Sequence, residues 1–101
     1  MMKQSKRGAP NHATRTDDLI STIASLSDRA LTERFLRDLC TRTELDAMAQ
    51  RWEVAQLVDQ GMPYLQIADR TGASTATVTR VAQWVRHGEG GYDAVLHQSR
   101  S

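Results

Sequence analysis

Apolar residues recur at helical spacing in several segments of the chain, and capping or turn residues separate these segments. Between residues 16 and 39 the pattern fits two short amphipathic helices, with Thr16 and Ser27 as their expected N-cap residues. The apolar stripes of the two helices are Leu19, Ile20, Ile23 and Leu26, and then Leu31, Phe35, Leu36 and Leu39.

A longer helix is predicted between residues 41 and 61. Thr41 and Glu44 have the spacing of a capping box, and Gly61 supplies the left-handed residue that commonly follows a helix. Val54 and Leu57 form a second apolar edge, so the apolar face of this helix is wider than one neighbouring helix would cover. This width indicates a contact between subunits. The main apolar stripe consists of Leu45, Met48, Ala49, Trp52, Ala55 and Val58.

Two short helices joined by a tight turn are predicted over residues 63–87. Pro63 suits the first helical position, Gly72 suits the turn, and Ser74 suits the N-cap of the second helix. Such a pair is typical of a helix-turn-helix. A final short helix is expected over 91–97, and no segment alternates like a strand, so the fold class is all-α with five to six short helices. The residues expected to fill the wedge between the paired helices are Ile67, Ala68, Ala73, Val78 and Val81.

The second helix of a helix-turn-helix enters the DNA major groove with its first turns leading. The segment GASTATVTRVAQWVR presents short hydroxyl and methyl groups that can approach base edges, and Arg80 suits guanine. Four basic residues, Lys3, Lys6, Arg7 and Arg15, are candidate phosphate contacts. The candidate DNA-binding residues are Tyr64, Gln66, Ser74, Thr75, Ala76, Thr77, Thr79, Arg80 and Gln83.

Charge is segregated along the chain although the net charge is only +1. Residues 1–15 hold four basic residues and no acid, and we expect them to form a disordered basic arm before a domain at 16–98. The dimerisation helices are predicted over residues 16–61. Residues 16–60 carry nine acids against five arginines, whereas residues 61–87 carry three arginines and one acid. This division fits a protein that presents one side to a polyanion. An ordinary mosaic of surface charge is the alternative.

Several other classes of protein are disfavoured by the sequence. No apolar run is long enough for a membrane span or a signal peptide, so we expect a cytoplasmic protein. Cys40 has no partner for an intrachain disulfide, and the three histidines lack metal-ligand spacing. No phosphate loop or nucleophile–base pair suggests an enzyme, and no cofactor is expected. The alternative to DNA binding is a helix-turn-helix used as a protein-interaction adaptor in a transcription complex.

The segment RWEVAQLVDQGMPYLQIADRTGASTATVTRV, followed by GGYDAVL, resembles the tryptophan-repressor-like family, particularly its YerC/YecD-type branch. The resemblance covers roughly residues 28–97. It implies an intertwined, all-helical homodimer that binds operator DNA as a transcriptional repressor. Two short N-terminal helices can hardly build a core within a chain of this length, which agrees with an exchange of helices between subunits.

The best-known member of that family binds tryptophan as corepressor between two arginines, which the resemblance matches to Arg51 and Arg80, with Thr41 as a further pocket residue. Val81 and Trp84 stand where that member has a glycine and a serine. We therefore expect their bulk to occlude the pocket, so that the protein binds DNA without tryptophan or with another ligand. Arg51 would then form a structural ion pair, with Glu44 or Asp59 of either subunit as candidate partners.

Overall fold

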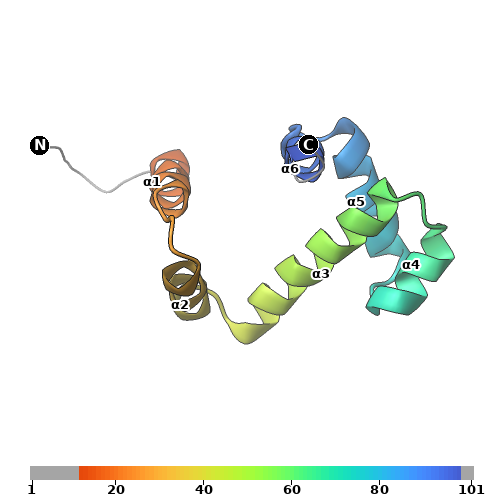
Figure 1. The fold of residues 1–101 in the computed structure, drawn as a ribbon, viewed down its shortest axis with the longest axis horizontal. Coiled ribbons are helices and arrows are strands. Elements are labelled where there is room, and N and C mark those ends of the chain that lie inside the picture. The colour runs from red at the N-terminus through yellow and green to blue at the C-terminus, as the bar shows by residue number, and fades with distance from the viewer. Residues whose placement is uncertain (1–11, 99–101) are drawn as a thin grey trace, which may run out of the picture. The chain divides into compact units, whose positions relative to one another are not determined.

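The computed structural model describes residues 12–98, which form six helices and contain no strand (Figure 1). The all-α prediction is confirmed. The described residues divide into two compact units, one ending at Cys40 and the other beginning at Thr41. The helices are α1 (His12–Ala24), α2 (Arg29–Leu39), α3 (Arg42–Asp59), α4 (Tyr64–Thr71), α5 (Thr75–His87) and α6 (Gly91–Gln98).

The first unit contains α1 and α2, and both begin at residues other than those expected. Helix α1 begins at His12, so residues 12–15 are helical and the prediction of a disordered arm as far as residue 15 is wrong there. No glycine or proline interrupts residues 12–24, and Ala13 and Arg15 favour a helix. Asp28 rather than Ser27 caps α2, because its carboxylate accepts a hydrogen bond from Ala30 N at 3.0 Å. The rest of the predicted arm, residues 1–11, lies outside the described residues.

This first unit lacks an interior of its own. Among its described side chains, residues 13–40, none is fully buried. Ile20 is 58% exposed, and Leu31 and Leu39 on α2 are also exposed. On α2, Arg29 and Arg37 form ion pairs with Glu33 at 3.2 and 2.9 Å. The helices are therefore formed, but much of their apolar surface is uncovered within this unit.

The second unit, with α3 to α6, holds the hydrophobic core. The predicted capping box of α3 is present: Thr41 Oγ1 accepts from Glu44 N at 3.0 Å, and the Glu44 carboxylate accepts from Thr41 N at 2.7 Å. Gly61 has the expected positive φ of 83° after α3. The buried residues of the core are Val54, Ala55, Leu57, Val58, Ile67, Ala73, Val78, Val81, Ala82 and Leu96.

In the C-terminal half of α3 both apolar edges are buried, so the second edge does not have the role expected from the sequence. Val54 and Leu57, which indicated a subunit contact, are buried inside the unit, because the C-terminal half of α3 packs against α4, α5 and α6. The start of the predicted main stripe is less covered, since Met48 is 38% exposed and Ala49 is exposed. The apolar surface left uncovered on α3 is therefore at its N-terminal half.

Candidate nucleic-acid interface

The turn between α4 and α5 is fixed by its own backbone and by side-chain hydrogen bonds. Gly72 has a φ of 78°, a left-handed conformation that strains residues with a Cβ. Thr71 Oγ1 accepts from Ala73 N at 3.2 Å, and Gln50 Nε2 of α3 donates to Thr71 O at 3.3 Å. Ser74 Oγ accepts from Thr77 N at 3.0 Å and so caps α5 as predicted. The start of α5 is thereby held at a defined place relative to α3 and α4.

The inner sides of α4 and α5 form the predicted wedge. Ile67, Val78 and Val81 are fully buried, and Ala73 is buried at the turn. Ala68, also predicted to face inward, is half-buried and packs against this core. The apolar periodicity of both helices thus identified the buried sides correctly, which leaves the opposite side of α5 free to face a partner.

The outward side of α5 carries most of the predicted DNA-binding residues, but two of these side chains already form hydrogen bonds at the start of the helix. The Ser74 hydroxyl also donates to the Thr77 hydroxyl at 3.0 Å, and Thr77 is half-buried. These two side chains cap the helix, so their hydroxyls are already engaged. The exposed residues on this helix from the predicted set are Thr75, Ala76, Thr79, Arg80 and Gln83.

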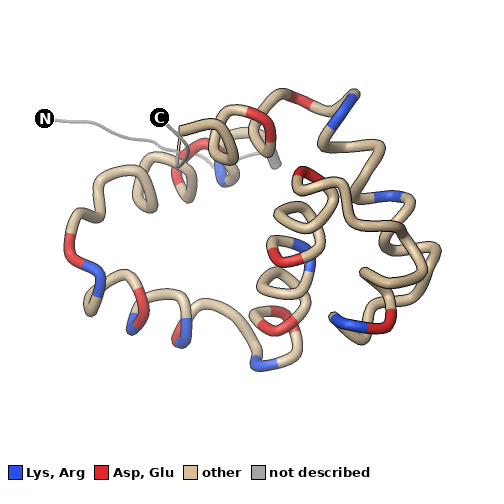
Figure 2. Tube along the Cα trace, turned by 45° about the vertical axis from the view of Figure 1, so that its right-hand side comes forward, with Lys and Arg blue, Asp and Glu red and all other residues tan. Residues whose placement is uncertain are grey.

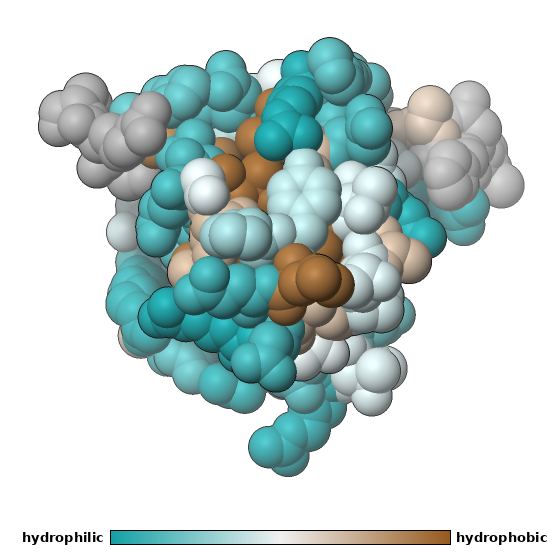
Figure 3. All heavy atoms as spheres, turned by 90° about the vertical axis from the view of Figure 1, so that its right-hand side faces the viewer, coloured by the Kyte–Doolittle hydropathy of each residue, from teal (hydrophilic) through white to brown (hydrophobic). Residues whose placement is uncertain are grey.

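On α4, the two residues that are predicted to contact DNA differ in their surroundings. Gln66 is exposed, whereas the hydroxyl oxygen of Tyr64 accepts a hydrogen bond from Arg86 Nη1 at 2.6 Å. Leu65 is 76% exposed. The side of the molecule on which α4 lies in Figure 1 is mainly hydrophilic or near-neutral, with apolar atoms showing near its centre and toward its upper part (Figure 3). The sequence pattern does not point to Arg86 or Leu65 as contact residues, because helical spacing alone does not show which exposed residues meet across two helices.

Charges in the second unit differ between the central helix and the helix-turn-helix. Acidic residues recur along α3, whereas the charged positions of α5 are arginines (Figure 2). Arg70, Arg80 and Arg86 are all exposed, and Asp69 is the acid among residues 61–87. Of the predicted phosphate contacts at the N-terminus, Arg15 lies exposed on α1, and Lys3, Lys6 and Arg7 lie outside the described residues.

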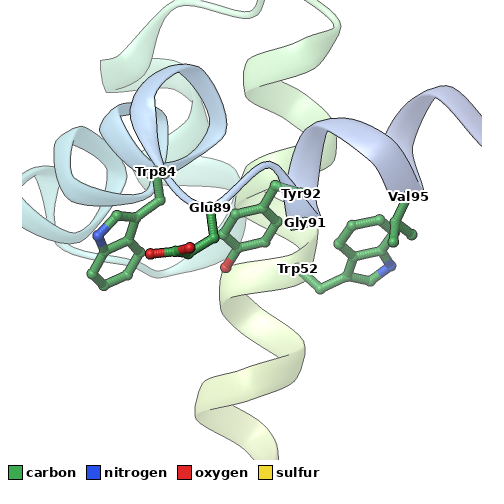
Figure 4. Close-up of a pocket in the computed structure, with 7 residues that line it drawn as sticks. Trp52, Trp84, Glu89, Gly91, Tyr92 and Val95 are labelled. Atoms are coloured by element: carbon green, nitrogen blue, oxygen red, sulfur yellow. The ribbon is translucent and has the colours of Figure 1, made fainter. Parts of the chain in front are cut away.

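Of the residues predicted for a ligand pocket, Trp84 lines a hollow of the second unit that the other four do not line. Val81 is in the core, Thr41 is exposed at the cap of α3, Arg51 is half-buried and Arg80 is exposed. Trp84, which is 44% exposed, instead lines an open apolar hollow of about 610 Å³ with Trp52 and Tyr92 (Figure 4). The rings of Trp52 and Tyr92 are stacked with centroids 6.4 Å apart.

The ion pair expected for Arg51 is not made within residues 12–98. Glu44 uses its carboxylate in the capping box. Asp59 lies near His97 of α6, with 3.9 Å between Asp59 Oδ1 and His97 Nε2.

No group of side chains among residues 12–98 could hold a metal ion. None of the helices in this described part of the chain is long and apolar enough to cross a membrane.

Comparison with known proteins places this helix-turn-helix in a family. The family model described as Trp repressor protein matches residues 14–100. The chain belongs to the Trp repressor family. This match confirms the family expected from the sequence. Members of the family are helix-turn-helix DNA-binding regulators rather than enzymes.

Relatives and solved structures within the Trp repressor family support the same fold. The chain is 42% identical over 80 residues to the YerC protein of Bacillus subtilis (strain 168), covering 79% of this chain and 77% of that protein. A crystal structure of a putative Trp repressor from Staphylococcus aureus has a TM-score of 0.79 at 35% identity, covering 85% of this chain and 86% of that one. A TrpR-like protein from Eubacterium eligens ATCC 27750 has a TM-score of 0.79 at 39% identity, covering 83% and 87%.

Proposed function

We propose that this protein is a sequence-specific transcriptional regulator of the repressor type, which reads the DNA major groove with α5. The observation that carries the proposal is the division of α5 into two sides. Val78, Val81 and Ala82 are buried, whereas Thr79 and Arg80 are exposed on a helix whose start is fixed by the turn. A helix held in this way can carry short hydroxyl groups and one guanidinium to base edges.

We also propose that the protein binds DNA as a homodimer. Exposed apolar residues on α1, such as Ile20 and Ile23, lack cover within the chain, and so do Leu31 and Leu39 on α2. Burial of such residues against a second copy would provide the core that the first unit lacks. A two-fold dimer carries two reading helices and so favours a pseudo-palindromic site with half-sites about one helical turn apart.

The proposal is tested by selecting bound sites from random DNA and measuring the affinity for a selected site as salt is varied. A DNA reader should yield a pseudo-palindromic consensus, and its affinity should fall steeply as salt rises because phosphate contacts release counterions. Binding without an enriched sequence would refute specific recognition. Absence of DNA binding at low salt would refute the function altogether.

The second candidate is a protein-interaction adaptor, and the exposure of Leu65 on α4 favours it. A leucine that is 76% exposed beside the proposed DNA-facing side could contact an apolar surface of another protein. A Leu65→Ser variant separates the two functions. DNA reading should survive the substitution, whereas an adaptor contact centred on this leucine would weaken.

A further inference from the structure

A polar contact links the ends of α4 and α5 that lie away from their connecting turn. Arg86 Nη1 donates to the hydroxyl oxygen of Tyr64 at 2.6 Å. The guanidinium carbon lies 6.0 Å from the centre of the tyrosine ring, at the outer limit for a cation–π attraction. The hydrogen bond is therefore the stronger part of the contact, and it is charge-assisted because arginine carries the donor.

The position of this contact closes a triangle. Helix α4 has 8 residues and α5 has 13, so they are about 12 Å and about 20 Å long. Two such helices are joined at one corner by the turn at Gly72, where Gln50 also binds the end of α4. At the opposite end of α4 the N-cap residue, Pro63, makes no side-chain capping hydrogen bond. The contact between Arg86 and Tyr64 supplies the third side of the triangle.

We propose that Arg86 and Tyr64 are positioning residues for DNA reading, and that their contact, the Arg86–Tyr64 brace, sets the angle at which α5 is presented. The inference rests on the proposed function. The Tyr64 ring packs against the hydrophobic core, so its hydroxyl is held in place, whereas Arg86 is on the exposed side of α5. The brace therefore ties the exposed Arg86 side chain to a tyrosine of the neighbouring helix that packs against the core.

A fixed angle matters more for bases than for phosphates. Hydrogen bonds to base edges need side chains placed within a fraction of an ångström, whereas contacts to phosphates depend mainly on charge. Loss of the brace should thus lower the affinity for a selected site and leave binding to random DNA nearly unchanged. A direct phosphate contact by either residue would weaken both kinds of binding.

The test uses the full chain and the variants Tyr64→Phe, Arg86→Gln and the double variant. Tyr64→Phe removes only the hydroxyl, and we expect about 3- to 10-fold weaker binding to the selected site with an unchanged salt slope. Arg86→Gln should reduce the ratio of specific to random binding by a similar factor. The double variant should lose little more than either single variant, because both remove the same contact. Tyr92→Phe and Arg70→Gln are the matched controls and should keep the ratio.

Amide hydrogen exchange provides a measurement that does not need DNA. Both single variants should speed exchange in α4, while the core amides of α5 keep their protection. Unchanged exchange in α4, additive losses in the double variant, or equal weakening on selected and random DNA would each overturn the brace. If the parent protein binds no DNA, the proposed function fails, and with it the role of the brace in DNA reading, even if exchange shows that the contact restrains α4.

Discussion

At the residue scale, α5 carries two kinds of predicted DNA-binding side chain. Some already form hydrogen bonds at the start of the helix, and others are exposed and can contact DNA. Ser74 and Thr77 hold each other at the start of the helix, whereas Thr79 and Arg80 are exposed one turn later. The short side chains allow a close approach to the groove. Among them, Arg80 has the reach and the paired donors that guanine recognition requires.

Replacing Arg80 with alanine should relax specificity at one base pair in each half-site. The expected cost is about 1–3 kcal/mol if the guanidinium binds guanine in a bidentate manner. Binding titrations against a panel of single-base variants of the selected site measure this effect. The matched control is Arg70→Ala, which removes an equal charge from α4 and should weaken all sequences alike. Uniform weakening by Arg80→Ala would identify Arg80 as a phosphate contact instead.

Tryptophan should not act as an effector of this protein. The side chain of Val81 is in the core. Trp84, three residues later, stands where the best-known member of the family has a serine. Isothermal titration of the purified protein with excess tryptophan should give no saturable heat. A Trp84→Ser variant provides the comparison, since it restores a small side chain there. Tight, saturable binding to the parent protein would contradict the expectation.

At the element scale, α2 carries ion pairs along one exposed side. The hydrogen bond and the charge of Arg37 hold the pKa of the Glu33 carboxyl below its ordinary value, and Arg29 adds to this effect. A carboxyl with a lowered folded pKa stabilises the fold above its unfolded pKa, and that contribution is lost as the pH falls through the folded pKa. Because these groups are on the surface, the contribution is small.

Acidification below the ordinary carboxyl range should therefore weaken α2, and an Arg37→Gln variant should move the pKa of Glu33 upward. Carbon-detected NMR titration of the Glu33 carboxyl measures the shift directly. Arg34→Gln removes a neighbouring charge on the same helix without touching the ion pair, so it should have the smaller effect. A Glu33 titration that is identical in the parent and in Arg37→Gln would show that the ion pair is absent in solution.

Local chemistry explains how much of these elements could be predicted. Capping and turn residues act within a few positions of the chain, so the capping box at Thr41, the cap at Ser74 and the turn at Gly72 were all identified from sequence. Competition between neighbouring caps was not, and Asp28 took the place expected for Ser27. The burial of Val54 was misassigned because helical spacing shows which sides are apolar but not which neighbour covers each one.

The candidate DNA-binding site could likewise be predicted only in part from the sequence. The hydroxyl-rich pattern of α5 located its outward side, since the intervening valines had to face inward. The contact of Tyr64 with Arg86 joins residues 22 positions apart, and no local spacing rule foretells it. The hollow beside Trp84 likewise depends on α3 and α6 meeting α5.

At the scale of the whole molecule, the uneven distribution of buried residues supports the proposed homodimer. Replacing Ile20 with glutamate should shift the protein from dimer to monomer, because it would place a charge in the proposed interface. Light scattering coupled to size-exclusion chromatography measures the mass. Leu65→Glu is the matched control, since it changes a similarly exposed residue on α4 and should leave the dimer intact. A dimeric Ile20→Glu protein would remove α1 from the interface.

The uncovered apolar faces of α1 and α2 also affect how the protein responds to its own abundance. In a dimer that completes its core only by association, the melting temperature rises with protein concentration. Dilution would then first separate the N-terminal helices of one copy from those of the other, while the separately packed α3–α6 unit keeps its core. Gene dosage would thus set the fraction of chains with two coupled reading helices, and occupancy of a palindromic site would rise more steeply than the amount of protein.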